Sequence, residues 1–254
     1  NNSWGDFDFN ATLGGNLYKV NNQTIVTTAK DMKIRDVVAL MSFNEVSVEP
    51  YSYRKQINSV YGAVNLGWKH MLYFDATLRG DQSSTLPISN NMYIYPSFSG
   101  SFVFSELLKL GDKLPYGKVR MSWAQVGSDT DPYQLGLVYT KSKFAYPGYT
   151  IGYISNGTIP NKDLKPTKTN SFEMGLELKF LKNRIGLDFT YYSQLSKNQI
   201  MGMASSSTSG YGYRLINAGE IENKGVEIAL NTRPIQTKDF SWDLNFNFSK
   251  NSNK

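Results

Sequence analysis

The sequence contains no cysteine among its 254 residues, which excludes disulfide frameworks, thiolate zinc sites and cysteine nucleophiles. It also lacks any run close to the roughly 18 consecutive apolar residues that a membrane-spanning helix needs, so any crossing of a membrane must be made by strands. No basic and then apolar leader follows Asn1. This start indicates either a cytosolic protein or a piece of a longer one, and we adopt the second interpretation.

Clustered charge is absent as well. The 27 Lys and Arg and 21 Asp and Glu residues give a net charge of +6, but they are dispersed, without a run of five like charges, so no nucleic-acid partner is expected. The only histidine, His70, follows Trp68 in a predicted turn and suggests no triad. Glu173 and Glu177 would lie about 13 Å apart along a strand, beyond the ~5–9.5 Å of glycosidase carboxylates. We therefore predict no enzyme activity, no metal site and no cofactor.

Aromatic residues are plentiful, with 17 Tyr, 14 Phe and 4 Trp, although the mean hydropathy is −0.40. Several segments alternate apolar and polar residues with a period of two, which is typical of strands with one apolar face. The clearest is 240–249, where Phe and Trp or Leu alternate with Ser, Asp and Asn. Nine strands are predicted, around residues 7–13, 55–67, 72–78, 92–104, 119–123, 172–180, 185–192, 225–231 and 240–249.

The predicted connections alternate strictly between long and short. The long ones are 15–52, 81–91, 128–168 and 198–222, and the short ones are 68–70, 108–116, 182–184 and 234–239. An outer-membrane barrel has long extracellular loops and short periplasmic turns, whereas a soluble sandwich has no such requirement. The fold class that we predict is therefore all-β, an antiparallel transmembrane β-barrel.

The polar positions of the strands are predicted to face a water-filled lumen, because they carry Gly, Ser, Asn and Thr as well as charged residues. The predicted lumen-facing residues are Asp6, Asp8, Asn10, Glu173, Glu177, Asp188, Glu227, Asp243 and Asn245. A soluble extracellular β-sandwich that binds carbohydrate and a structural barrel or adhesin remain as alternatives.

One predicted contact within this face is unfavourable. If a hairpin closes over residues 181–184, Glu177 lies directly opposite Asp188, and like charges in that arrangement are destabilising. Lys179, a bound cation or a raised pKa on one carboxyl group would compensate.

Two predicted long loops are rich in aromatic residues. We expect these side chains to bind substrate by stacking on sugar rings or on a partner protein, although packing within the loops would also explain them. The candidates are Phe144, Tyr146, Tyr149, Tyr153, Tyr211 and Tyr213.

A series of ordered motifs resembles the SusC/RagA family of TonB-dependent outer-membrane transporters of Bacteroidetes. The motifs span nearly the whole chain, in the order in which the family has them. They are RGDQSSTLP at 79–87, YPS at 95–97, FVFSEL at 102–107, GKVRMSWAQVGSDTDPY at 117–133, LKPTKTNSFEMGL at 164–176 and NAGEIENKGVE at 217–227.

The resemblance implies active import of oligosaccharides (glycans) or peptides across the bacterial outer membrane. It implies a barrel of about 22 strands around an N-terminal plug, so residues 1–254 are expected to be a partial barrel domain without plug or TonB box. The implied partners are a SusD-like surface lipoprotein, TonB through the missing N-terminal region, outer-membrane lipid and the cargo, in an assembly of two SusC–SusD pairs.

Overall fold

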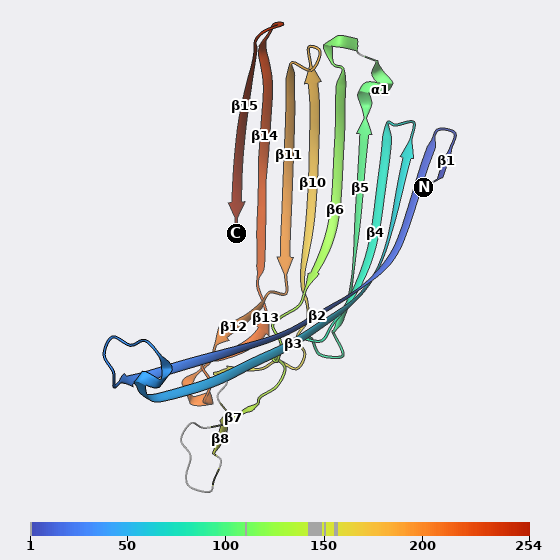
Figure 1. Cartoon of the computed structure of the whole chain (residues 1–254). Coiled ribbons are helices and arrows are strands. Elements are labelled where there is room, and N and C mark those ends of the chain that lie inside the picture. The colour runs from blue at the N-terminus through green and yellow to red at the C-terminus, as the bar shows by residue number, and fades with distance from the viewer. Residues whose placement is uncertain (1, 110, 142–148, 150, 155–156) are drawn as a thin grey trace.

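The computed structural model describes residues 2–109, 111–141, 149, 151–154 and 157–254. Its main feature is one antiparallel sheet of ten strands, in which each strand pairs with its nearest sheet neighbours along the chain (Figure 1). The strands, in sheet order, are β1 (Asn2–Trp4), β2 (Phe7–Met32), β3 (Phe43–Trp68), β4 (Leu72–Ser83), β5 (Met92–Val103), β6 (Tyr116–Ser128), β10 (Thr167–Phe180), β11 (Ile185–Lys197), β14 (Glu220–Gln236) and β15 (Ser241–Asn253).

The remaining elements are short and lie between these strands. β7 (Tyr139–Lys141) pairs with β8 (Gly152–Ile154), and β13 (Tyr213–Asn217) lies between β12 (Ile200–Ala204) and β9 (Thr158–Ile159). The helices are η1 (Leu40–Ser42), α1 (Phe104–Leu108), η2 (Gly111–Lys113) and η3 (Ser207–Ser209). None of the helices in the described part of the chain is long and apolar enough to cross a membrane.

The nine segments predicted as strands correspond to the nine long strands of the sheet, from β2 to β15, and the tenth strand, β1, has only three residues. The expectation of a loop over 15–52 was wrong. β2 and β3 contain 26 residues each and pair almost throughout, and only residues 33–42 connect them. The Val, Ile and Thr residues of this segment favour strands, but polar residues occur on both of its faces, so the alternation is weak.

The long hairpin formed by β2 and β3 leaves the sheet at one end. Figure 1 shows both strands continuing past the ends of β4 and β5 and sweeping across beneath the rest of the sheet, on the side where β7, β8, β12 and β13 also lie. The tight connections gather at the opposite end. Two of them, at 69–70 and 181–183, consist of residues with positive φ, which tight hairpin connections require.

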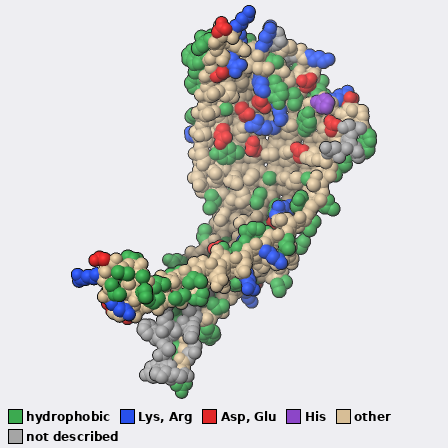
Figure 2. Space-filling view, in the orientation of Figure 1, with side chains coloured by type: hydrophobic (Ala, Val, Ile, Leu, Met, Phe, Trp, Pro, Cys, Tyr) green, Lys and Arg blue, Asp and Glu red, His purple; other side chains and the backbone are tan. Residues whose placement is uncertain are grey.

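The strand register assigns residues to faces, because residues directly opposite each other point to the same side. Asn10 pairs with Asn65, which pairs with Asp75, and the row continues through β5 and β6 to Glu173. All the predicted lumen-facing residues except Asp6 share this polar face. Figure 2 shows acidic and basic side chains gathered on it.

Asp6 is the exception because it precedes β2 in the turn after β1. Its carbonyl oxygen accepts a hydrogen bond of 2.8 Å from the backbone N–H of Lys69, and its carboxylate lies 3.5 Å from the ammonium group of the same lysine. His70, in the neighbouring turn, has its Nδ1 atom 3.9 Å from Asp8. These contacts place Asp6 in a turn at the end of the sheet, beside the connection between β3 and β4.

The apolar face is uncovered. Phe98, Phe246 and Phe248 are 45%, 58% and 57% exposed, and in the described part of the chain the only other sheets are those of two and three short strands in the loops. A soluble sandwich would bury this face against a second sheet. The single sheet with an exposed aromatic face therefore contradicts the sandwich alternative and agrees with a strand wall that contacts lipid.

We predict that Phe98→Arg lowers the free energy of unfolding by about 2–4 kcal/mol, because it places a charge on the lipid-facing side near the middle of β5. Phe98 stacks on Trp123, with ring centroids 6.1 Å apart. Denaturant unfolding of the full-length protein in lipid vesicles measures the loss. The control is Ser99→Arg, which places the same charge on the polar face beside Asp75. Equal losses for the two variants would contradict the assignment of faces.

Candidate functional site

A row of side-chain hydrogen bonds crosses four strands on the polar face. Asn10 donates to Asn65 over 3.2 Å, and Asn65 donates to Asp75 over 2.6 Å. Ser99 also donates to Asp75, over 3.0 Å. The row ties β2, β3, β4 and β5 together by side chains that remain partly open to solvent, as expected for the wall of a hydrated passage.

Arg120 on β6 is the centre of a charged cluster on the same face. It donates two hydrogen bonds to Asp188, one from Nη1 over 3.1 Å and one from Nη2 over 3.0 Å. Nη2 also donates to Thr190 over 2.7 Å, and Nε lies 3.7 Å from Glu173. Because the guanidinium group is planar, this two-pronged contact fixes both orientation and distance.

Gly175 makes this contact possible. It lies on β10 directly between Arg120 on β6 and Thr190 on β11, so the arginine side chain must cross it to reach Asp188. A Cβ atom at this position would come within 2.6 Å of the guanidinium carbon. Glycine is therefore needed at position 175 because the Arg120 side chain passes close to it, and not because of an unusual backbone φ.

The pairing of Glu177 with Asp188 is confirmed, and the structure shows how the repulsion is relieved. Lys179, one of the predicted compensating groups, lies 3.6 Å from Glu177. The stronger compensation comes from Arg120, which the sequence analysis missed. Its alternation with Val119 and Met121 already indicated an inward position, but the register of β6 against β10 was not predicted. No group of three or more His, Asp or Glu side chains in the described residues is placed to hold a metal ion.

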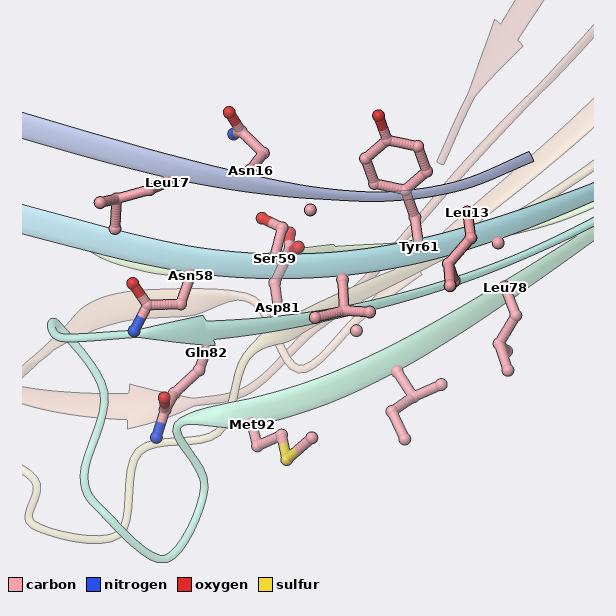
Figure 3. A pocket seen from close by; sticks show the side chains of 15 residues that line it. Leu13, Asn16, Leu17, Asn58, Ser59, Tyr61, Leu78, Asp81, Gln82 and Met92 are labelled. Atoms are coloured by element: carbon pink, nitrogen blue, oxygen red, sulfur yellow. The ribbon is translucent and has the colours of Figure 1, made fainter.

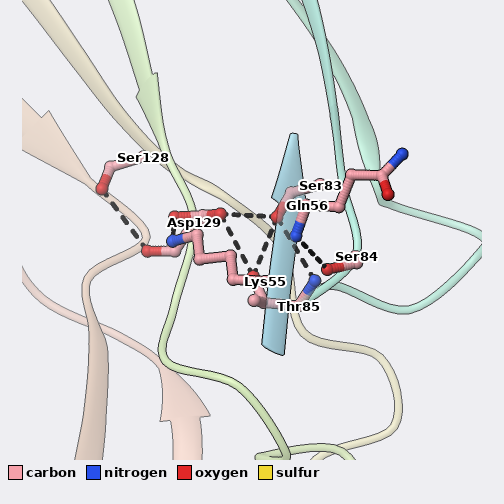
Figure 4. Close-up of polar contacts among 7 residues, drawn as sticks. All are labelled: Lys55, Gln56, Ser83, Ser84, Thr85, Ser128 and Asp129. Atoms are coloured by element: carbon pink, nitrogen blue, oxygen red, sulfur yellow. Dashed lines mark hydrogen bonds and ion pairs between the residues drawn. The ribbon is translucent and has the colours of Figure 1, made fainter. Parts of the chain in front are cut away.

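A second polar cluster holds the base of the loops together (Figure 4). Asp129, just after β6, accepts hydrogen bonds from Ser83 over 2.5 Å and from Thr85 over 3.2 Å, and its other oxygen lies 2.7 Å from the ammonium group of Lys55. Ser83 and Thr85 are buried. The cluster therefore joins the long hairpin, the end of β4 and the start of the loop after β6.

The motifs at 164–176 and 217–227 meet in the same region. Asn217 donates to the carbonyl oxygen of Lys165 and accepts from its backbone N–H, both over 2.8 Å, and it also donates to the carbonyl oxygen of Asn198. Beside this contact lies a small apolar core, which consists of Leu86, Tyr93, Leu164 and Leu215. The motifs that seemed to be independent landmarks in the sequence thus pack against one another at the loop bases.

The predicted binding aromatics lie in two different loops, and two of them belong to separate small sheets. Tyr153 belongs to β8 and Tyr213 to β13, and both are exposed, as is Tyr149, while Tyr211 is half-buried. Among the described tyrosines, none of one loop forms a ring contact with a tyrosine of the other loop. Phe144 and Tyr146 lie outside the described residues.

The two loops are nevertheless connected through their backbones. β9, from the loop after β6, pairs in parallel with β13, from the loop after β11, so that Thr158 lies beside Tyr213 and Ile159 beside Arg214. The carbonyl oxygen of Gly157 accepts a hydrogen bond of 2.9 Å from the N–H of Tyr213. Sequence patterns gave no sign of this pairing because β9 has only two residues.

We predict that Arg120→Gln destabilises the sheet by about 1–2 kcal/mol, a value at the low end for charged hydrogen bonds because the pair is partly exposed. Denaturant unfolding of the full-length protein in vesicles measures it. Asp188→Asn should also lower stability, which means that the bond to Arg120 outweighs the repulsion from Glu177. In the Arg120→Gln background Asp188→Asn should cost nothing further, and an additive loss would refute the contact.

Asp129→Ala should loosen the loop bases without unfolding the sheet, because it removes the acceptor shared by Ser83, Thr85 and Lys55. We expect faster amide hydrogen exchange over residues 83–91 and 129–138 and unchanged exchange in β11. Asp131→Ala, a substitution of an exposed carboxylate in the same loop, is the matched control. Unchanged exchange in the Asp129 variant would show that the cluster does not organise the loops.

The chain is similar to known outer-membrane receptors in both sequence and fold. The family model described as "TonB dependent receptor-like, beta-barrel" matches residues 1–254. TonB-dependent receptor P3 of Formosa agariphila is 28% identical over the whole chain, and TonB-dependent receptor SusC of Bacteroides thetaiotaomicron is 29% identical over 80% of it. The chain spans 26% and 21% of the lengths of these two relatives.

Solved structures agree on the fold. The chain of the RagAB peptide transporter structure superposes with a TM-score of 0.87 at 21% identity, with 98% of this chain and 28% of that chain covered. The outer membrane transporter YddB from Escherichia coli gives a TM-score of 0.65 at 13% identity, with 99% and 32% covered. The polar wall, the uncovered aromatic face and the joined loop bases are thus parts of an outer-membrane strand wall, and the chain belongs to the TonB-dependent receptor β-barrel family, with SusC/RagA-type transporters among its relatives.

Proposed function

We propose that the receptor to which this chain belongs imports oligosaccharides or peptides across the outer membrane, with energy delivered through TonB. This chain supplies about nine strands of barrel wall and the loops around the extracellular mouth. The observation that carries the proposal is that the hydrogen-bonded polar face leads directly to the end of the sheet where the long loops gather. Outer-membrane barrels place long loops outside the cell.

The polar face would line the passage. Asp8, Asn10, Glu173, Glu177, Asp188, Glu227, Asp243 and Asn245 point to one side of the wall. Several of them are held in place by neighbours, as Asp188 is by Arg120 and Asp243 is by Arg233, whose Nε donates to it over 2.6 Å. A wall of fixed, hydrated polar groups would let polar cargo pass with little binding to the wall itself.

Cargo selection would lie in the loops. Tyr149, Tyr153 and Tyr213 expose aromatic faces, which can stack on sugar rings or on the side chains of a peptide. The RagAB structure is that of a peptide transporter, and this chain is only 21% identical to it. Both cargo classes therefore belong to the proposal.

Such a receptor would work with partner proteins. A SusD-like surface lipoprotein would close over the loop end of the barrel, and the RagAB peptide importer has been solved in an 'open-open' and a 'closed-closed' state. TonB would act through an N-terminal plug, and two transporter–lipoprotein pairs would associate as a dimer. A structural barrel or adhesin differs from this proposal because it would bind at the surface without energised uptake.

The direct test is uptake by cells that express the full-length receptor. The probes are a fluorescein-labelled mixture of polysaccharide-derived oligosaccharides and a fluorescein-labelled tryptic peptide mixture, each measured with and without a protonophore. Accumulation of either probe that needs both the receptor and the proton gradient supports import and identifies the cargo class. Surface binding without accumulation would favour the adhesin.

We predict that the double substitution of Tyr149 and Tyr213 by Ala weakens binding of the accumulated probe about fivefold or more, since stacked aromatics are worth roughly 0.5–1.5 kcal/mol each. Equilibrium binding to the purified receptor measures the change. Tyr73→Ala is the matched control, because this tyrosine lies near the opposite end of β4 on the polar face. Equal weakening by Tyr73→Ala would show that the loop tyrosines do not select cargo.

A further inference from the structure

A hollow opens on the apolar face where β2, β3, β4 and β5 run side by side. Its volume is about 840 Å³, within the ~300–1,000 Å³ typical of small-molecule sites. In Figure 3 the side chains of Leu13, Leu78 and Gln82 project to one side of the strands, and those of Asn16 and Tyr61 project to the other. The hollow is therefore separate from the lumen side and from the loop tyrosines.

Glycines create the hollow. On the outward face, glycine positions alternate with large side chains across neighbouring strands, so that each missing side chain leaves a gap between two apolar walls. Gly62 lies between Leu13 and Leu78, Gly80 lies between Val60 and Ile94, and Gly15 lies beside Val60. A Cβ atom at Gly80 would find Ile94 at 3.7 Å, which is an ordinary contact. The gap is thus real space that a larger side chain would fill.

The hollow changes character towards the loop end of the strands. The next outward row contains Asn58 directly opposite Gln82, and beyond it Lys19 lies opposite Gln56. Arg54, two residues further along β3, points to the same side. The side chains of Lys19 and Arg54 are exposed, and neither forms an ion pair with another described residue. Towards the loop end, the outward face therefore presents first the apolar hollow, then the two neutral amides Asn58 and Gln82, and then the cations Lys19 and Arg54.

We infer that this hollow is a binding site for one anionic lipid of the outer leaflet. A hydrocarbon chain would lie in the glycine-formed gap, with the polar backbone of the lipid at Asn58 and Gln82 and its phosphate near Lys19 and Arg54. Along a strand, Lys19 is about 7 Å and Arg54 about 13 Å beyond the amide row, distances that a lipid headgroup spans. Cations near a membrane surface attract anionic lipids.

The chemistry of the face favours a lipid over a protein occupant. The hollow is continuous with the aromatic and aliphatic surface that the barrel presents to hydrocarbon, so lipid is the molecule that reaches it. A second copy of the chain docked through the same face would bring another Lys19 and Arg54 into a shared apolar interface, where charges without partners are costly. This inference depends on the barrel being in the membrane and not on which cargo the receptor imports.

The test uses the full-length receptor in nanodiscs that contain equal amounts of phosphatidylglycerol and phosphatidylcholine, followed by mild detergent washing and native mass spectrometry of retained lipid. Wild-type receptor should retain phosphatidylglycerol preferentially. The Lys19→Gln/Arg54→Gln variant should lose that preference, by about fivefold for each cation removed. Gly80→Leu, which fills the gap, should lose retained lipid of both kinds.

Two matched controls accompany these variants. Gly100→Leu changes another outward glycine, on β5 nearer the short-turn end, and Lys250→Gln removes another outward cation, on β15 at the loop end. Both should keep wild-type retention. Equal retention of the two lipids by wild-type receptor, or unchanged retention in the Lys19/Arg54 and Gly80 variants, would overturn the site. Loss of a receptor dimer in Gly80→Leu without loss of lipid would overturn it in favour of a second copy.

Discussion

The whole structure depends on antiparallel pairing of strands in a fixed register, with each strand satisfying the backbone hydrogen bonds of its neighbours. Because side chains alternate, this pairing places every second residue on the same side of ten consecutive strands. One side then becomes a polar wall and the other an apolar surface without any buried core between layers. Only five hydrophobic residues are buried in the described part of the chain, Leu86, Tyr93, Val103, Leu164 and Leu215, and three of them lie outside the long strands. The stability of the wall therefore comes from the ladder and from the lipid, and the small core serves the loops.

The register of the strands determines which charged side chains of the polar wall lie next to each other. The register brings Glu177 on β10 opposite Asp188 on β11. Arg120 on β6 reaches Asp188 by crossing β10 at Gly175, where the missing side chain leaves the space. Residues that are ordinary in composition, one arginine and one glycine, thus acquire their roles from being placed in adjacent rows. At the loop bases, Asp129 likewise links segments that are far apart in the sequence, because it contacts Ser83 and Thr85 around the end of β4 and Lys55 on β3.

These cases also explain which features can be predicted from the sequence. Periodicity of two identifies strands and faces, so the nine long strands, the shared face of Glu173 and Glu227, and the opposed acids were predictable from local patterns and one short turn. Contacts between strands that are joined by long loops could not be predicted, because the register of such strands depends on tertiary pairing. Arg120 with Asp188, separated by 68 residues, and Lys55 with Asp129, separated by 74, belong to this class. The prediction of a loop over residues 15–52 was wrong for another reason. Outside the membrane both faces of a strand meet water, so apolar and polar residues no longer alternate clearly along it.

The length of β2 and β3 has a mechanical consequence. A strand of 26 residues extends about 85 Å, nearly three times the ~30 Å thickness of a bilayer's hydrocarbon, so most of the hairpin stands clear of the lipid as a two-stranded arm. Its root is anchored at Lys55 by the ion pair with Asp129, beside the segment where the arm leaves the wall. A load applied at the tip therefore reaches the loop bases around the mouth with a long moment arm, and any molecule that grips the tip gains mechanical advantage over the entrance.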